Sequence, residues 1–416
     1  MVSRPQRAFR GRNTLKRFPS GRVKHPLPLV HPPWLNHLLL LLLAMAKTNP
    51  VQIESLLLQQ TLHAFVQGER LTDLSPVNWE KLLALAAFHR FIPILQTTLD
   101  KNALPPEIRS RIDQASRQQR IRTALLVEAF ATINNRLAQV GIPVMPVKGM
   151  YLAHQVYGSV NHRYFDDIDL LIPATQANEA VRLMHELGYI VHPQAEKPDW
   201  HHLSPFLHEK SKVVVELHTD VIRRAGPGWD VAGIWQRAER GRIANVETWL
   251  INPADALIHT AIHARHSLYR RISFFLDAHL QLNQLTITPQ VVHRVREAGA
   301  QVALAYLQGE GANLFGIAAA GQPFTAPAWR LALTRRLAGW DLAEDQQNRL
   351  TEGPLPNLVE LLLMDSWGRS IQMAHRLIFP PPQFLAEFYG QEQRLNYGKR
   401  FVQRTRRLAR QIISKQ

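Results

Sequence analysis

Apolar side chains in the first part of the chain recur at helical spacing. Residues 51–66, 79–99 and about 106–140 place them at intervals of three and four, which predicts helices over these segments. The last helix is expected to end at Gly141, because glycine is typical of helix C-termini. The sequence therefore predicts an N-terminal helical region over residues 48–140.

Residues 141–225 follow a different pattern, in which short apolar runs alternate with helical segments. Strands are predicted over 144–147, 168–172, 189–191 and 212–217, with helices after Gly149 and over 175–187. Strands and helices that alternate within so short a stretch predict a compact α/β or α+β core.

The chain returns to helical spacing after Gly226-Pro227-Gly228. The expected helices lie over 253–265, 271–285, 289–308, 328–340 and 357–378, separated by Gly and Pro residues at 309–311, 323–327 and 353–354. We therefore expect a C-terminal helical region over residues 226–380. A Pro-rich connection and a basic helix are expected over 381–416.

The net charge of +16 comes from the two ends of the 416-residue chain. Residues 1–44 and 393–416 each contain eight Lys or Arg and no acidic residue. Without these sixteen, the 49 basic residues fall to the number of acidic ones, 33, so the body of the chain is formally neutral. The charge therefore does not by itself predict a nucleic-acid-binding fold. The basic C-terminal helix is suited to contact with nucleic acid or an anionic membrane surface. The alternative is a solvated terminal helix without a partner.

Residues 1–47 form a basic, Pro-rich leader. We expect it to be disordered or to precede the true start at Met45; the alternative is a signal peptide with an apolar core over 38–43. There is no run of about 18 apolar residues, so no transmembrane segment is expected. The absence of Cys excludes disulfides, Cys-ligated zinc and a thiol nucleophile, and it fits a reducing, cytoplasmic location.

Three acidic residues in the predicted core suggest metal chemistry. Asp167 and Asp169 are two apart on a predicted strand, so their side chains lie on one face and repel each other unless a cation lies between them. Glu216 lies within a Val-rich strand, where an unpaired carboxylate is costly. If the two strands are neighbours, three carboxylates converge, and such oxygen ligands suit one or two Mg²⁺ ions. The alternative for the Asp pair alone is a solvated strand end.

Lys148 and Gly149 lie between a predicted strand and a helix. A Lys followed by a Gly that opens a helix brings a cation and free backbone N–H groups to one point, which suits phosphate oxygens. The alternative for this pair alone is an ordinary turn.

Four further residues share one face of the helix predicted over 253–265, with spacings of four, four and three: Asp255, His259, His263 and His266. Imidazoles four residues apart can ligate zinc, but histidines that pack and hydrogen-bond locally explain the pattern more simply. Between these interpretations, Asp255, His259, His263 and also His218 are candidates to line a substrate cleft.

The order of these motifs resembles a known family. The segments are V-K-G-M-Y-L-A-H-Q-V-Y-G, H-R-Y-F-D-D-I-D-L-L-I and V-V-V-E-L-H, within a wider likeness over about residues 50–405. They resemble the uncharacterised nucleotidyltransferase family of the polymerase β-like nucleotidyltransferase superfamily. The resemblance implies an α+β fold, with a small mixed β-sheet core embedded between N-terminal and C-terminal helical regions.

The resemblance also implies roles for individual residues. Asp167 and Asp169 would be the metal-binding pair and Glu216 the third carboxylate, while Arg163 matches an Arg of the family and would contact phosphate. Lys148-Gly149 replaces the Gly-Ser of many superfamily members, which weakens the case for triphosphate binding. Other departures are Thr219 in place of a Trp and an additional acid, Asp166, expected on the opposite side of the strand.

These observations predict a Mg²⁺-dependent enzyme that transfers a nucleoside monophosphate from an NTP to an unknown hydroxyl acceptor, small or macromolecular. One rival is transfer to a protein or to an RNA end. The other is a catalytically degenerate fold that acts as a binding or antitoxin-like partner.

Overall fold

A five-stranded mixed sheet carries the acidic residues. In the computed structural model the strand order is β1-β2-β5-β4-β3. Only β2 (Asp167–Leu171) and β5 (Val213–His218) run parallel; β1 (Met145–Pro146), β4 (Phe206–His208) and β3 (Tyr189–Val191) are antiparallel to their neighbours. The mixed sheet between helical regions confirms the predicted α+β class, and the neighbouring β2 and β5 meet the condition for convergent carboxylates.

The structure describes residues 53–193 (except 73, 75 and 76), 203–221, 230–316, 324–338 and 355–378. All of them belong to one unit, residues 47–416. The predicted leader with its alternative start or signal peptide, and the Pro-rich connection with the basic C-terminal helix, lie outside the described residues.

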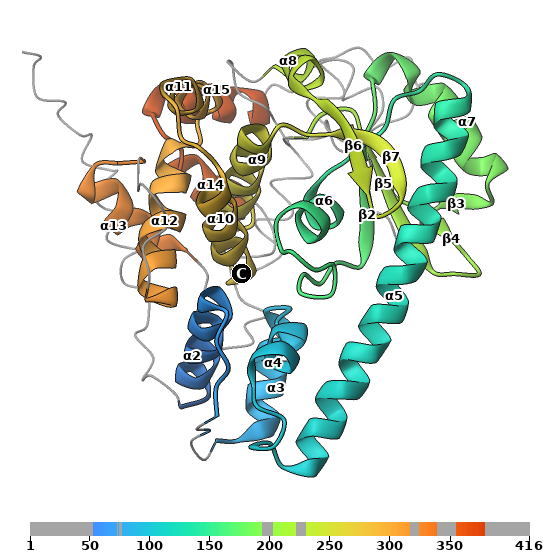
Figure 1. Ribbon diagram of the computed structural model, residues 1–416. Helices are drawn as coiled ribbons and strands as arrows, with labels where there is room; N and C mark the ends of the chain where they lie inside the picture. The colour runs from blue at the N-terminus through green and yellow to red at the C-terminus, as the bar shows by residue number, and fades with distance from the viewer. Residues whose placement is uncertain are drawn as a thin grey trace, which may run out of the picture. The chain divides into compact units, whose positions relative to one another are not determined.

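One face of the sheet is apolar and covered by two helices, α5 (Pro106–Gln139) and α7 (Ala177–Glu186) (Figure 1). Alternate strand residues such as Ile168 and Val215 enter a core with apolar residues of these helices. Because strand side chains alternate, the intervening Asp167, Asp169 and Glu216 face the opposite side. The apolar core thus orients the acids.

Helix α5 also holds the two parallel strands at their starts. The Arg122 guanidinium donates to the backbone carbonyls of Asp166 (3.0 Å), Ser211 (3.2 Å) and Lys212 (2.8 Å). These carbonyls immediately precede β2 and β5, so one side chain bonds to the entry of both strands. We infer that Arg122 helps to fix their register.

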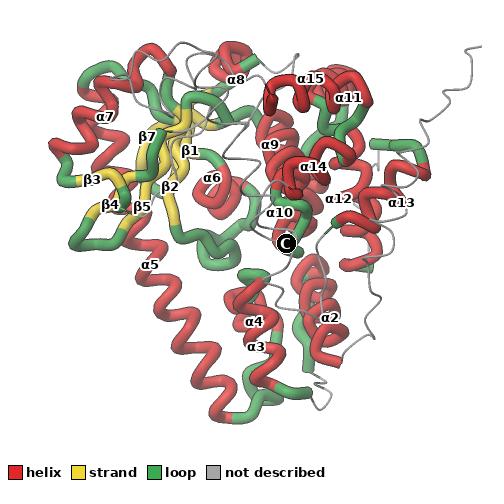
Figure 2. Tube along the Cα trace, turned by 180° about the vertical axis from the view of Figure 1, so that it is seen from behind, coloured by secondary structure: helices red, strands yellow, loops and turns green. Residues whose placement is uncertain are grey.

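Beyond β1 the chain enters α6 (Lys148–Gln155), which lies on the side of the sheet away from α5 (Figures 1 and 2). A Cβ at Gly149 would lie 2.5 Å from the Cβ of Phe165. Real Cβ atoms do not approach so closely, so this helix start packs against the segment before β2 only because residue 149 is glycine.

The N-terminal helical region contains α2 (Ile53–Gln67), α3 (Trp79–Phe88) and α4 (Ile92–Thr98). The prediction of one helix over 79–99 was wrong at its middle, because Arg90 adopts a left-handed φ of 68° and ends the first segment. Pro93 is suited to the start of the second, since proline is tolerated in a first turn.

The C-terminal region is helical after a short hairpin. In order, its elements are α8 (Val231–Arg237), β6 (Glu239–Ile243), β7 (Val246–Leu250), α9 (Pro253–His266), α10 (Ser273–Gln284), α11 (Pro289–Ala298), α12 (Gln301–Phe315), α13 (Ala328–Leu337), α14 (Leu355–Leu362) and α15 (Trp367–Ile378). The sequence did not predict the β6–β7 hairpin or β4. The helix predicted over 289–308 is two helices because Gly299 takes a φ of 70°, whereas Gly309 and Gly311 lie inside α12.

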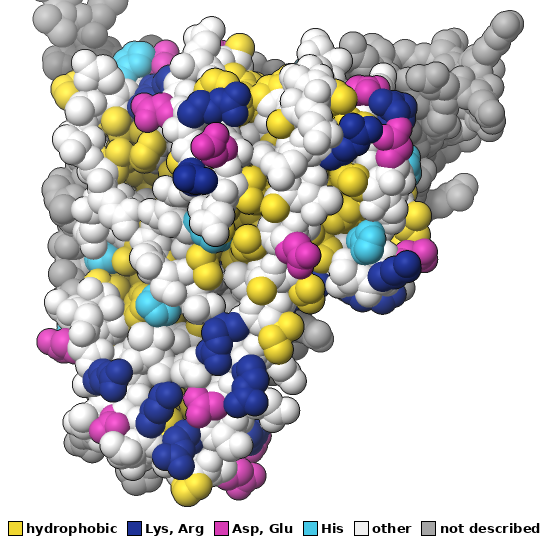
Figure 3. Space-filling model, turned by 45° about the vertical axis from the view of Figure 1, so that its right-hand side comes forward, with side chains coloured by type: hydrophobic (Ala, Val, Ile, Leu, Met, Phe, Trp, Pro, Cys, Tyr) yellow, Lys and Arg dark blue, Asp and Glu magenta, His cyan; other side chains and the backbone are white. Residues whose placement is uncertain are grey.

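Basic side chains gather on one part of the surface, near the N-terminal helices and the first half of α5 (Figure 3). Several have partners: Arg111 pairs with Glu80, and Arg120 bonds to Gln96. None of the described helices is long and apolar enough to cross a membrane.

Candidate active site

Asp169 and Glu216 face each other across the parallel strands. They are register partners in the β2–β5 ladder, and His218 follows two residues later on the same face of β5. One ligand atom from each of the three side chains lies within 4.8 Å of the others. Asp169 is only 3% exposed and His218 is fully buried, so a polar cluster lies at an otherwise apolar sheet.

The ammonium of Lys148 lies within this cluster. Its Nζ is 2.5 Å from Asp169 Oδ1 and 3.5 Å from Glu216 Oε2. Burial alone would lower the pKa of Lys148, but the two carboxylates outweigh it and the pKa lies above its ordinary value. The residue also has a left-handed φ of 51°, an uncommon conformation for a side-chain-bearing residue. One internal cation therefore offsets part of the negative charge of the two acids.

The sequence predicted His218 only as a residue lining a substrate cleft, but its side chain directly contacts the acids. Its Nε2 lies 2.8 Å from Asp169 Oδ1 and 3.4 Å from Glu216 Oε2. The signal was present in the sequence, because E-L-H places the Glu and the His on one face of a strand. His218 is thus part of the acidic cluster.

Asp167 lies on the same face of β2 but outside the group of three. Burial, and next the neighbouring charge of Asp169, raise the pKa of Asp167 to about 7. The side of the strand predicted for Asp166 stays a prediction; its Oδ1 lies 3.4 Å from a guanidinium nitrogen of Arg90. Asp167 and Asp169 therefore lie on the same face of β2.

A cavity of about 410 Å³ lies over these residues. We call its strand side the sheet wall, formed by Lys148, Gly149, Asp167, Asp169 and Glu216. We call its α9–α10 side the helical wall, formed by His259, Thr260, His263, Arg270, Arg271 and Phe274. Phe88, Leu152, Phe165 and the remaining lining residues, including Arg90, Arg163 and Asp277, complete the boundary. The volume lies within the range of ordinary ligand pockets.

Arg163 lines the cavity, but its guanidinium is bound to Asp277 of α10. The Nε–Oδ1 and Nη2–Oδ2 distances are 2.7 and 2.8 Å, and the Tyr157 hydroxyl donates to the same carboxylate at 2.6 Å. Burial alone would lower the pKa of Arg163, but the charge of Asp277 outweighs burial, so the pKa lies above its ordinary value. This bidentate pair joins the segment before β2 to the helical wall.

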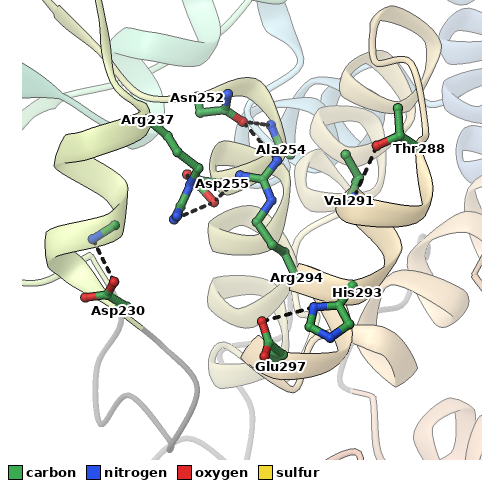
Figure 4. Close-up of polar contacts among 11 residues, drawn as sticks. Asp230, Arg237, Asn252, Ala254, Asp255, Thr288, Val291, His293, Arg294 and Glu297 are labelled. Carbon is green, nitrogen blue, oxygen red and sulfur yellow. Dashed lines mark hydrogen bonds and ion pairs between the residues drawn. The ribbon is translucent and has the colours of Figure 1, made fainter.

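The four residues predicted to share a face of α9 have separate surroundings. His259 and His263 line the cavity, with ring centroids 6.1 Å apart, and burial lowers the pKa of both well below the ordinary value. Asp255 does not line the cavity: its carboxylate accepts from Arg237 at 2.8 Å and Arg294 at 3.1 Å (Figure 4). His266 lies 2.9 Å from Glu360 of α14.

Asp255 therefore joins α8, α9 and α11 rather than serving the cleft. The zinc interpretation of this helix face has no support either, because the metal-capable group found among the described residues is Asp169, Glu216 and His218.

The comparison with protein families identifies the chain. The uncharacterised nucleotidyltransferase family matches residues 75–315, a span that holds both walls of the cavity. The chain belongs to this family. Among solved structures, it is similar to the antibiotic-resistance factor ANT(2'')-Ia in solution, with 16% identity and a TM-score of 0.32 over 47% of this chain and 96% of that one. A comparison with curated proteins finds no match.

Sequence reasoning missed three arginines that line the cavity of this nucleotidyltransferase family member: Arg90, Arg270 and Arg271. The first lies at the break between α3 and α4, and the other two lie in the turn between α9 and α10. No motif marked them, because each depends on a turn that brings distant segments together.

Proposed function

We propose that this protein transfers a nucleoside monophosphate from an NTP to a hydroxyl-bearing acceptor. The observation that carries the proposal is the register of Asp169 against Glu216, with Asp167 on the same face, at a cavity in a chain of the nucleotidyltransferase family. Acidic side chains that share one face in this way are suited to phosphoryl chemistry when a divalent ion is present.

The residues present fit a divalent metal. Asp167, Asp169 and Glu216 would hold Mg²⁺ through carboxylate oxygens, and His218 adds a nitrogen donor within 4.8 Å of two of them. The Lys148 ammonium between the acids supports a site that favours positive charge. When bound, Mg²⁺ supplies charge neutralisation at the phosphates and lowers the pKa of a coordinated hydroxyl.

The chain's own residues supply the rest of the chemistry. The acceptor oxygen attacks the α-phosphorus, the new P–O bond forms as the α–β bridging bond breaks, and pyrophosphate leaves. The Glu216 carboxylate takes the hydroxyl proton, directly or through water. Lys148, once released from the acids, and the N-terminal N–H groups of α6 stabilise phosphate oxygens. Arg163 acts as a positioning residue through Asp277.

Binding calorimetry tests this proposal without knowledge of the acceptor. Each NTP is titrated with Mg²⁺ into the wild type and into the Asp167→Asn/Asp169→Asn variant. We expect the wild type to bind one or more NTPs in a Mg²⁺-dependent manner and the folded variant to lose that dependence. Asp113→Asn, in α5 and outside the residues that line the cavity, is the matched control. Equal Mg²⁺-dependent binding by wild type and double variant would contradict the proposal.

One observation favours a second candidate, the degenerate fold that acts as a binding or antitoxin-like partner. Lys148 contacts both Asp169 and Glu216, so these acids already have a counter-cation within the chain. In that case the folded wild type binds no Mg²⁺-NTP, whereas Lys148→Met gains affinity for Mn²⁺, measured by electron paramagnetic resonance. Mg²⁺-NTP binding by the wild type would reject this candidate.

A further inference from the structure

The turn between α9 and α10 presents two arginines, Arg270 and Arg271, to the cavity. The residues before them, Leu268 and Tyr269, both adopt left-handed conformations, with φ of 51° and 54°. Neither is glycine, so each conformation is strained and persists only where the surroundings fix it. The conformation of this turn is therefore fixed by the residues packed around it.

Packing explains how the strained turn is maintained. The side chains of Leu268 and Tyr269 are 2% and 0% exposed. The Tyr269 ring packs edge-on against Tyr306 of α12, with centroids 4.8 Å apart. Burying two large side chains offsets the backbone strain, and it leaves the next two residues directed at the cavity.

The charge that this turn carries is incompletely balanced. The Arg270 guanidinium donates to the Ser267 carbonyl at 3.3 Å, while among the described residues no hydrogen bond or ion pair engages the Arg271 guanidinium. Burial, and next the charge of Arg90, lower the pKa of Arg271 to about 10. Arg90 itself pairs with the exposed carboxylate of Asp166. Several arginine guanidinium groups thus line the same cavity.

The other two cations of the cavity are fully engaged. Lys148 lies between Asp169 and Glu216, and Arg163 forms its bidentate pair with Asp277. A triphosphate at the sheet wall would need further positive charge for its terminal phosphates. Guanidinium groups match phosphate oxygens in shape as well as charge.

We infer that Arg271, with Arg270 and Arg90, binds the β and γ phosphates of the nucleoside triphosphate; this assignment rests on the proposed function. It adds three guanidinium groups to the single ammonium that Lys148 supplies once it is released from the acids. It also explains the strained turn, since a side chain held in place before binding loses less entropy when the ligand arrives.

Calorimetry with ATP, AMP and inorganic tripolyphosphate, each with Mg²⁺, tests the inference. We expect Arg271→Gln to weaken ATP and tripolyphosphate binding at least tenfold, because a charge-assisted contact is lost. AMP affinity should change less than twofold. Arg271→Lys should have an affinity between those of the wild type and Arg271→Gln, since lysine keeps the charge but not the paired N–H donors of the guanidinium. The control variant Arg117→Gln, at an exposed position of α5, should bind ATP with wild-type affinity.

The unfolding temperature without ligand separates binding from folding. Arg271→Gln should unfold at the wild-type temperature or above, since it removes repulsion with Arg90. Wild-type affinity for ATP and tripolyphosphate in folded Arg271→Gln would overturn the inference, as would an equal loss for AMP. If the wild type binds none of the NTPs with Mg²⁺, the proposed function fails with this assignment; NTP and tripolyphosphate binding that survives the substitution overturns this assignment alone.

Discussion

The two walls of the cavity handle charge in opposite ways. On the sheet wall, the Lys148 ammonium lies between Asp169 and Glu216, so opposite charges meet and the cluster is satisfied within the chain. On the helical wall, neutral imidazoles lie beside arginines, and Arg271 is unpaired among the described residues. The sheet wall therefore has an internal counter-cation for its acids, whereas the helical wall has positive charge that an anion would balance.

The backbone shows where this arrangement is strained. Among the described residues, six other than glycine have positive φ. Four of them border the cavity or lead into its lining: Arg90, Lys148, Leu268 and Tyr269. Strained backbone that concentrates at one cavity supports a functional role for that cavity.

The largest expected effect comes from breaking the buried ion pair between Arg163 and Asp277 at the boundary of the cavity. Asp277→Asn leaves the Arg163 guanidinium buried with a neutral partner, so the free energy of unfolding should fall by about 3–5 kcal/mol. Urea denaturation measures it, with Asp113→Asn as control. A loss below about 1 kcal/mol would show that this pair does not stabilise the contact between the segment before β2 and α10.

Removing one cation from each wall tests the comparison directly. Lys148→Met leaves two carboxylates facing each other, so stability should fall by about 2–3 kcal/mol, less than for a fully buried pair because Lys148 and Glu216 are partly exposed. Arg271→Gln should leave stability unchanged or raise it. Equal destabilisation by both substitutions would contradict the contrast between the walls.

A smaller effect is expected from the helix start at the sheet wall. Gly149→Ala places a Cβ 2.5 Å from that of Phe165, so it should destabilise the protein by about 1–3 kcal/mol. Gly309→Ala is the matched control, because it has open space in the middle of α12 and should be neutral or stabilising by up to about 1 kcal/mol. Unfolding temperatures compare the two; equal shifts would reject the close contact.

The smallest effect concerns pH in the absence of metal and nucleotide. The folded protein holds the Asp167 proton more tightly than the unfolded chain does, because the pKa of Asp167 is raised to about 7. Its contribution to stability therefore declines as pH rises from about 4 to about 7 and is constant above that range. Asp167→Asn should remove this part of the slope in urea titrations across pH, and a wild-type slope in the variant would count against the shift.

Sequence patterns predicted the sheet wall well. Alternation of apolar residues with Asp167 and Asp169 fixed which side of β2 the acids occupy, and the Val-rich run around Glu216 marked the neighbouring strand. Both signals are local, because strand periodicity alone determines which face a side chain takes.

The opposite side of the cavity was predictable only in part: helical spacing marked His259 and His263 as cleft residues, whereas the arginines had no such signal. Arg90 reaches the cavity because a continuous helical pattern breaks at a non-glycine residue, and Arg271 does so because Leu268 and Tyr269 are held left-handed by distant packing. Such turns depend on tertiary contacts, which override local preference. The β6–β7 hairpin was missed for a related reason, since its first strand, Glu239–Ile243, is mostly polar.

A crystal structure with Mg²⁺ and a non-hydrolysable ATP analogue tests the central claim most directly. We predict the metal at Asp167 and Asp169, Lys148 released from the acids, and the terminal phosphates at Arg271. A nucleotide bound outside the cavity, or Lys148 still between Asp169 and Glu216 with no metal beside them, would contradict it.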